Sequence, residues 1–249
     1  MSGHSKWSSI KRSKGVADAQ RGQLFTKLSK EIIISAKQGG PDPNANFRLR
    51  LAVQKARDNN MPAENIKRAI ERASGGGEGA ELAEITYEGF GPAGTAVLVD
   101  VATDNRNRTV AEVGNVFALS GGNLGEAGSV AWNFENRGVI SLAANGKDTD
   151  DIALYAIDAG AEDVQVGEET IEVYTAPADL EKVKKALEEH ALKVESAEAA
   201  RVPKTTVQHD EKAAIQVLRL VEKLEGLDDV QKVYFNAEFS DDVLASYTS

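Results

Sequence analysis

The hydrophobic pattern of this 249-residue chain changes once, at a Gly-, Glu- and Ala-rich stretch between Gly75 and Leu82. Before it, apolar residues recur at helical spacing in three short segments. After it, β-branched and apolar runs of strand length alternate with helical segments. A stretch of this composition is typical of a linker. The sequence therefore predicts a small helical bundle followed by mixed α and β structure.

The three predicted helices are separated by helix-breaking residues. The first helix stops at Gly39-Gly40-Pro41, the second near Asn59-Asn60, and the third runs from Pro62 to Gly75-Gly76-Gly77. Each carries an apolar stripe at i, i+3, i+4 and i+7 spacing, so its Lys and Arg side chains fall on the opposite, solvent-facing side.

The remainder of the chain has a repeated order of elements. We expect a strand, a helix, two strands, a helix and a strand at 138–143, 148–159, 163–166, 170–174, 178–190 and 192–196. This β-α-β-β-α-β order is the split βαβ unit of a ferredoxin-like domain. Elements expected at 95–103, 109–119, 129–134, 199–207, 214–224 and 230–236 form a second such set, which the first interrupts.

The predicted fold class is therefore α+β, with a three-helix domain and two ferredoxin-like domains, the third inserted in the second. We expect a basic helical domain at 1–76, a ferredoxin-like domain at 82–136 plus 198–249, and the inserted domain at 137–197. Each is large enough to bury a modest core.

The chain contains no cysteine, which excludes disulfides, thiolate metal sites and cysteine nucleophiles. No apolar run near the start has the length of a signal-peptide core or a membrane span. We therefore expect a cytoplasmic protein with no membrane association.

Charge is distributed very unevenly along the chain. Residues 1–74 carry a balance of +9, whereas the remaining 175 residues carry −19, which leaves a net charge of −10. An acidic body is repelled by a polyphosphate unless one part of it presents enough Lys and Arg to neutralise phosphates. The basic segment therefore predicts a nucleic-acid partner; the alternative is that it pairs with the acidic body.

The candidate nucleic-acid-binding residues fall into three groups. An N-terminal arm combines cations with one aromatic ring that could stack on a base or anchor the arm onto the bundle: Lys6, Trp7, Lys11, Arg12 and Lys14. The helices contribute Arg21, Lys27, Lys30, Arg48, Arg50, Arg57, Lys67 and Arg68, with Lys55 and Arg72 also on their outer sides. Arg106 and Arg108 form an outlying group.

Arg106 and Arg108 stand in the run Asp104-Asn105-Arg106-Asn107-Arg108-Thr109, between a predicted strand and helix. Unpaired backbone N–H groups and two guanidinium groups at this point could hold a phosphate. Equally, Asp104 or Asn105 could cap the helix while the arginines pair with nearby carboxylates.

Catalytic signals are weak. The three histidines, His4, His190 and His209, fall in different segments, with no spacing typical of a metal site. The run from Gly89 to Gly94 has the form GxGxxG, but it leads into a strand rather than a helix, which favours a turn over a dinucleotide site. We therefore expect no enzyme activity and no catalytic residue, cofactor, metal or small-molecule substrate.

Several blocks, in the same order along the chain, closely resemble the YebC/PmpR family. They are Gly3-His4-Ser5-Lys6-Trp7, Arg21-Gly22-Gln23-Leu24-Phe25-Thr26-Lys27, Tyr87-Glu88-Gly89-Phe90-Gly91-Pro92, Asp104-Asn105-Arg106-Asn107-Arg108-Thr109, Gly121-Gly122-Asn123-Leu124-Gly125 and Val230-Gln231-Lys232-Val233-Tyr234. The resemblance runs nearly end to end. In the arm, Lys11-Arg12-Ser13-Lys14-Gly15 departs from the Lys/His-rich stretch usual in the family.

The resemblance implies a cytoplasmic three-domain protein that regulates transcription and binds DNA. A mitochondrial relative is a translational activator of cytochrome oxidase subunit one, and bacterial members are also associated with the ribosome. The partner expected from the resemblance is therefore DNA, with ribosomal RNA on the ribosome as the alternative. An enzyme or a protein-interaction scaffold is a further alternative class, because ferredoxin-like folds host many functions.

Overall fold

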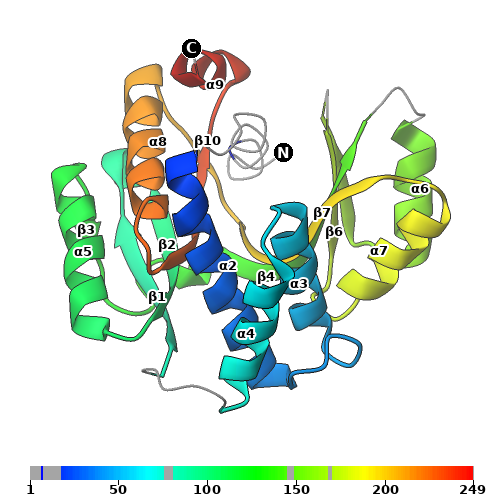
Figure 1. Ribbon diagram of the computed structural model, residues 1–249. Helices are drawn as coiled ribbons and strands as arrows, with labels where there is room; N and C mark the ends of the chain where they lie inside the picture. The colour runs from blue at the N-terminus through cyan, green and yellow to red at the C-terminus, as the bar shows by residue number, and fades with distance from the viewer. Residues whose placement is uncertain (1–6, 8–17, 76–80, 145–148, 168–169, 249) are drawn as a thin grey trace.

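The computed structural model describes residue 7 and residues 18–75, 81–144, 149–167 and 170–248. It shows an N-terminal helical region followed by two antiparallel sheets, each covered by helices (Figure 1). The α+β class predicted from the sequence is therefore confirmed. Within the described ranges, no helix has the length and apolar character needed to cross a membrane.

The helical region consists of α2 (Asp18–Gly39), α3 (Phe47–Asp58) and α4 (Ala63–Ala73). One apolar core joins them, with Ile32, Leu49 and Ile66 among its buried members. Gly40 has a φ of +88°, which a glycine adopts without strain, and this ends α2 as the sequence predicted. The side chain of Asn46 caps α3 by accepting a hydrogen bond from Leu49 N at 3.0 Å.

The second domain is built on a four-stranded antiparallel sheet in the order β3-β1-β2-β9. Its strands are β1 (Ala83–Phe90), β2 (Ala96–Thr103), β3 (Asn123–Leu124) and β9 (Val230–Phe235). Side chains alternate along β2, so Val97 and Val99 pack toward α5 (Arg106–Leu119) and α8 (Glu211–Glu225), which cover one face. A short pair, β8 (Val207–Gln208) and β10 (Ala237–Glu238), precedes the terminal α9 (Asp241–Thr248).

Three details of this domain differ from the prediction. Strand β1, which pairs along its whole length with β2, has no counterpart among the expected elements. The strand expected at 129–134 is a 3-10 turn, η2 (Ala131–Asn133), that leads into β4 (Phe134–Ala143). The strand expected at 199–207 belongs mainly to the third domain's sheet, as the end of β7 (Val194–Pro203).

The third domain has the predicted β-α-β-β-α-β order. It comprises β4 (Phe134–Ala143), α6 (Thr149–Ala159), β5 (Asp163–Val166), β6 (Thr170–Thr175), α7 (Leu180–Glu189) and β7 (Val194–Pro203). The strands lie in the order β5-β6-β4-β7, and α6 and α7 share a core with one face of this sheet.

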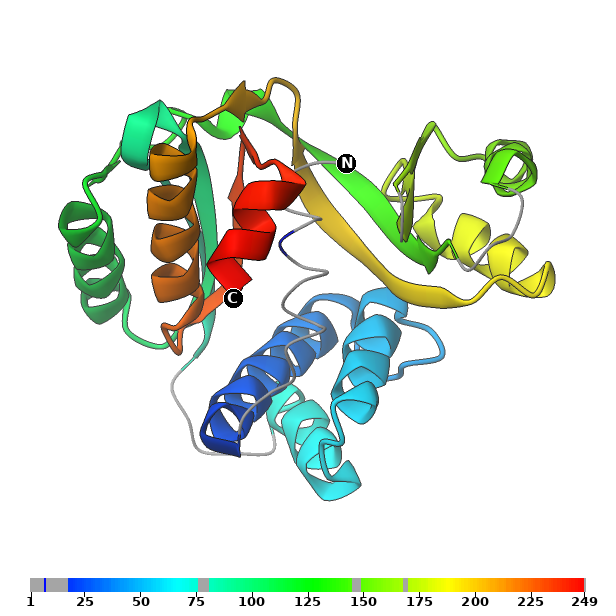
Figure 2. The ribbon, with the colours of Figure 1, turned by 90° about the horizontal axis from the view of Figure 1, so that it is seen from above.

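Strands β4 and β7 are longer than predicted and connect the two sheet domains. Phe134 pairs with Pro203 and Leu142 with Val194, so the two strands run side by side between the domains (Figure 2). Near the second domain, Phe134 packs with Leu98 on the sheet face opposite α5 and α8. The boundaries expected at 136/137 and 197/198 therefore fall inside continuous strands.

Candidate nucleic-acid interface

The cations of the N-terminal arm, Lys6, Lys11, Arg12 and Lys14, lie outside the described residues. Trp7 is described, and only 4% of it is exposed. Its Nε1 donates to Glu225 Oε2 at 3.1 Å, and its ring meets Tyr247 edge-on, with centroids 5.8 Å apart. The ring is thus buried in the core of the second domain. Burial favours the anchoring alternative for Trp7 over base stacking, with this core rather than the helical bundle as the anchoring site.

One edge of α2 is bound to the loop that follows α8. Lys27 Nζ donates to Glu225 O at 2.6 Å, and Lys30 Nζ donates to Asp228 O at 3.0 Å. Gln23 Nε2 donates to Asp228 Oδ1 at 2.8 Å. The spacing of these three α2 residues, i, i+4 and i+7, places them on one side of the helix. Lys27 and Lys30 therefore hold the helical region to the second domain, which favours a structural role for them over phosphate binding.

Asp229 is the centre of this contact. Its carboxylate, 5% exposed, accepts hydrogen bonds from Lys30 Nζ at 2.5 Å, Arg108 Nη2 at 2.6 Å, Thr109 Oγ1 at 2.7 Å and Thr103 Oγ1 at 3.0 Å. Burial alone would raise the pKa of Asp229, but the hydrogen bonds from Lys30, Thr109 and Arg108 outweigh it and hold that pKa well below its usual range. The charged form is thus strongly favoured in the folded protein.

Two cations of α3 also contact the acidic domains. Arg48 Nη2 lies 2.8 Å from Glu84 Oε1 of β1, and Arg50 pairs with Glu181 of α7. Phe47, next to Arg48, packs against the core of the third domain. The alternative in which the basic segment pairs with the acidic body is therefore realised by this side of the bundle. Arg48 and Arg50 nevertheless remain partly exposed.

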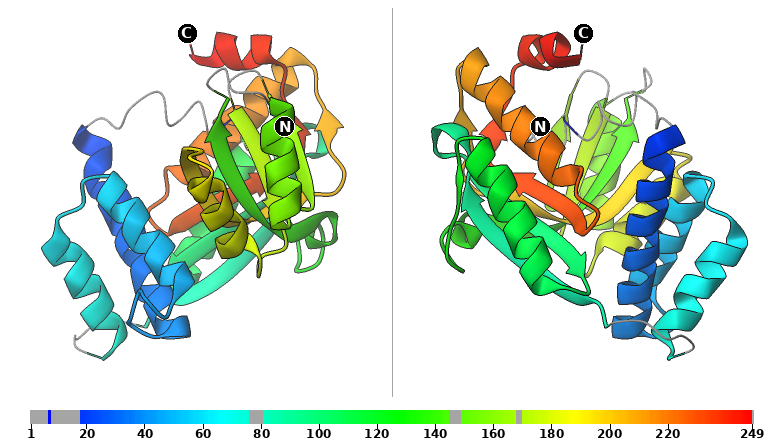
Figure 3. Two further views of the ribbon diagram at one scale, coloured as in Figure 1. Left: turned by 90° about the vertical axis from the view of Figure 1, so that its right-hand side faces the viewer. Right: turned by 60° about the vertical axis from the view of Figure 1, so that its left-hand side comes forward.

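The other side of the bundle presents cations to solvent. We call it the α3–α4 cationic surface, and its exposed members are Lys55, Arg57, Lys67, Arg68 and Arg72. Among the described residues, Lys55, Arg57 and Arg72 form no ion pair, and Lys67 has only an exposed partner within α4, Glu71 at 3.7 Å. Figure 3 (left) shows α4 at the outer edge of the molecule. Arg21, at the start of α2, is exposed as well.

The Asp104–Thr109 run is mainly a helix cap. Asn105 accepts from Arg108 N at 3.1 Å, and the Arg108 guanidinium pairs with Asp104 at 3.0 Å as well as with Asp229. These pairs raise the pKa of Arg108, the Asp229 hydrogen bond most of all. The capping alternative is thus correct for Asn105 and Arg108.

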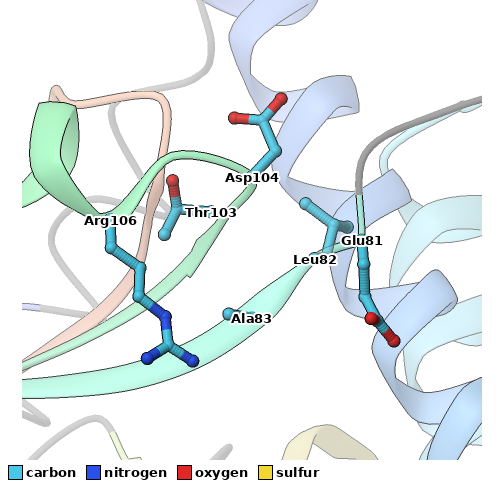
Figure 4. Close-up of a pocket in the computed structure, with 6 residues that line it drawn as sticks. All are labelled: Glu81, Leu82, Ala83, Thr103, Asp104 and Arg106. Carbon is cyan, nitrogen blue, oxygen red and sulfur yellow. The ribbon is translucent and has the colours of Figure 1, made fainter.

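Arg106 differs from Arg108, because its side chain is exposed and lines a pocket with Glu81, Leu82, Ala83, Thr103 and Asp104. Figure 4 shows its guanidinium pointing away from the Asp104 carboxylate. This arginine therefore remains a candidate for phosphate contact, some distance along the chain from α3 and α4.

The two described histidines lie in separate environments, and the described residues contain no group of three or more His, Asp or Glu side chains placed to hold a metal ion. His209 Nε2 lies 2.7 Å from Thr95 Oγ1, and burial lowers the pKa of this histidine. His190 stacks against Tyr155 with ring centroids 4.6 Å apart. The chemistry available to the surface described above is the binding of anions.

One strongly exposed aromatic residue is not among the predicted site residues. Trp132, in η2, is the most exposed aromatic side chain of the described chain, at 69%. The strand predicted at 129–134 does not identify Trp132 as a candidate site residue, and nothing in the local sequence signals that its ring faces solvent.

Fold and surface together define a three-domain α+β protein in which a helical domain with a cationic outer surface is attached to two acidic sheet domains. Family models described as "TACO1/YebC protein N-terminal domain" and "TACO1/YebC second and third domain" match residues 5–76 and 82–237. The chain belongs to the TACO1/YebC family, as the sequence resemblance implied.

Relatives match over almost the whole chain. A probable transcriptional regulatory protein of Dehalococcoides mccartyi is 57% identical over 100% of this chain and 99% of its own length. One from Herpetosiphon aurantiacus is 52% identical over 99% and 98%. The crystal structure of a conserved hypothetical protein from Aquifex aeolicus has a TM-score of 0.84 at 47% identity, covering 91% of this chain and 94% of that one.

Proposed function

We propose that this chain is a non-enzymatic regulator of gene expression that binds DNA through the α3–α4 cationic surface and acts in the cytoplasm. The observation that carries the proposal is the division of cations within the helical region. Lys27 and Lys30 are committed to the second domain, whereas the outer residues Lys55, Arg57, Lys67, Arg68 and Arg72 are exposed. The names of the relatives, probable transcriptional regulatory proteins, support the regulatory role.

The charge of the rest of the molecule favours contact chiefly through this surface. The sheet domains are strongly acidic and repel phosphate, so a duplex approaches most favourably where α3 and α4 face outward. Each phosphate neutralised by a Lys or Arg releases counterions, and affinity therefore falls with salt. Arg21, Arg106 and the arm residues Lys6, Lys11, Arg12 and Lys14 are proposed as additional contacts.

The test compares a triple variant, Arg57→Gln with Lys67→Gln and Arg68→Gln, with a control carrying Lys182→Gln, Lys185→Gln and Lys193→Gln. Both sets are exposed and remove the same charge, but the control residues belong to the third domain. Affinity for duplex DNA is measured across a salt series. If all three outer cations meet phosphates, the log–log slope should weaken by about 2.7, at roughly 0.9 per contact.

The control should bind as the unaltered protein does or slightly more weakly. Equal binding by the two variants would contradict docking through α3 and α4. Adding ribosomes as competitors tests the partner, because a preference for ribosomes at physiological salt would replace DNA with ribosomal RNA.

A further inference from the structure

Trp132 protrudes from a turn whose other members are buried or half-buried. Val130 and Asn133 are 1% and 3% exposed and Ala131 is half-buried, whereas Trp132 is 69% exposed. An aromatic ring of this size stabilises a protein most when buried, so its exposure is not explained by the stability of the fold.

The backbone that carries Trp132 is tightly fixed. The buried Glu88 carboxylate accepts hydrogen bonds from Gly128 N at 2.7 Å, Val130 N at 2.8 Å and Ala131 N at 2.8 Å. Burial would raise the pKa of Glu88, but these three N–H groups, together with the charge of Arg201, outweigh burial and lower it. The turn is thus organised around a charged side chain before any ligand arrives.

The indole itself is also oriented. Trp132 Nε1 donates to Ser129 O at 3.0 Å, so its single polar group is satisfied within the turn. What remains for a partner is the face of the ring. A ring already fixed in place loses little conformational entropy when a flat ligand stacks on it.

A cation contacts the backbone of Trp132. Lys204, which is exposed, donates from Nζ to Trp132 O at 3.0 Å, and its backbone N donates to Asn133 O at 2.7 Å. Thr205 adds a hydrogen bond from its N to Asn133 Oδ1 at 3.0 Å. The segment 204–205 is therefore bound to the turn, and the ammonium group is held at the main-chain carbonyl of the residue that carries the ring.

We infer that Trp132 and Lys204 form a stacking site for an unpaired nucleobase, with the lysine placed for the adjoining phosphate. Single-stranded nucleic acids are bound by this combination of aromatic face and cation. The sequence neighbours of the ring are half-buried Ala131 and buried Asn133, whereas a protein partner would require a contiguous apolar patch. This inference rests on the proposed function and adds a contact on the second domain, separate from α3 and α4.

The test uses oligonucleotides of about 16 nucleotides, the upper site size of a small single-strand-binding domain. Four probes are compared: oligouridine, oligothymidine, an abasic strand with the same phosphates, and duplex DNA. Because Trp7 is buried and Trp132 exposed, stacking should quench Trp132 emission selectively, and Trp132→Phe provides the background from Trp7.

Oligouridine and oligothymidine, whose bases are unpaired, should quench the emission. The abasic strand, which has no bases, and the duplex, whose bases are paired, should not. Trp132→Ala should weaken binding of the single strands about tenfold, which is typical of the loss of one base–aromatic stack, without changing the salt slope. Lys204→Gln should instead reduce the slope by about 0.7, the value for one contact on a single strand. Comparing the affinities of oligouridine and oligothymidine distinguishes RNA from DNA as the source of the base.

Unchanged single-strand affinity in Trp132→Ala, while the α3–α4 triple variant loses binding, would overturn this inference and leave the proposed function intact. Loss of binding in Trp132→Ala but not in the triple variant would support this inference and contradict docking through α3 and α4. Equal quenching by the abasic strand would show that no base stacks. Self-association that disappears in Trp132→Ala would assign the ring to a protein contact and overturn the inference.

Discussion

Lys30 Nζ lies 2.5 Å from Asp229 Oδ1, and this ion pair joins α2 to the loop between α8 and β9. The lysine side chain is 15% exposed and the aspartate 5%. Both charges are thus largely removed from water, and their hydrogen bonds to neighbouring groups compensate for that loss. The basic helical region therefore has two electrostatic roles, since its inner edge holds the acidic body and its outer edge is open to a ligand.

Asp229→Asn should destabilise the protein strongly. The substitution removes a charge that Lys30 and Arg108 share, and breaking a buried pair in this way costs about 3 kcal/mol. Chemical denaturation at pH 7 measures the loss of unfolding free energy. Asp228→Asn is the matched control, because the neighbouring carboxylate is exposed and should contribute no more than about 0.5 kcal/mol. Equal effects of the two substitutions would contradict the central role of Asp229.

Comparison of the unaltered protein with Asp229→Asn also predicts how stability depends on pH. The pKa of Asp229 is lowered in the folded state, so its contribution is complete above the unfolded value of about 3.9 and is lost as pH falls toward the folded value. The difference in unfolding free energy between the unaltered protein and Asp229→Asn should be constant from pH 7 to about 5 and then shrink below about 4. A difference that persists undiminished at the lowest pH that retains the fold would contradict this assignment.

Lys30→Gln should change stability, whereas Lys67→Gln should change DNA binding. Lys30→Gln loses a charged hydrogen bond to a buried carboxylate and should lower the unfolding free energy by about 2 kcal/mol, while the salt slope of DNA binding is unchanged. Lys67→Gln should change stability by less than about 0.5 kcal/mol, since its ion pair is exposed, but should reduce the slope by about 0.9. If both substitutions change stability, or both change the salt slope, the inner and outer edges of the helical region do not have separate roles.

The two tryptophans form a second matched pair. Trp7→Ala removes a ring buried among the side chains of the second domain and should cost roughly 3–5 kcal/mol, with a smaller loss for Trp7→Phe. Trp132→Ala should alter the unfolding free energy by about 0.5 kcal/mol or less. Denaturant titrations followed by circular dichroism measure both without relying on tryptophan emission. A stable Trp7→Ala protein would contradict the anchoring role.

The helices and the third domain were predictable because their signals are local. The apolar spacing of α2, α3 and α4 and the breaks between them lie within short windows of sequence. Strand β1 was missed although Ile85 and Tyr87 alternate with Glu84, Thr86 and Glu88. The glycines from Gly89 onward indicate a turn, and that signal obscures the strand that precedes them.

The division of the cations was not predictable, since it depends on contacts between distant parts of the chain. Lys30 and Asp229 are 199 residues apart, and Trp7 and Glu225 are 218 apart. Charge and helical spacing place Lys30 and Lys67 alike on the polar side of a helix. Only the packing of α2 against the second domain decides which lysine is paired and which is exposed.

Gly89 illustrates how a motif can have a packing role rather than a ligand-binding one. It lies within β1, and a Cβ at this position would come within 2.8 Å of Asn123 O and of two atoms of the Phe117 ring, which is fully buried. Gly89→Ala should therefore force the ring or strand β3 to move and cost about 1–3 kcal/mol. The affinity for DNA should be unaffected where the variant remains folded.

Gly22→Ala provides the control with the opposite sign. Gly22 is in α2, and nothing lies within 4 Å of a Cβ added there. Alanine should therefore stabilise this helix by roughly 0.5–1 kcal/mol. Unfolding free energies of the two variants, measured in the same buffer, give the comparison. A neutral Gly89→Ala would mean that the β1–β3 edge can adapt, and the glycine would then need an explanation other than close packing.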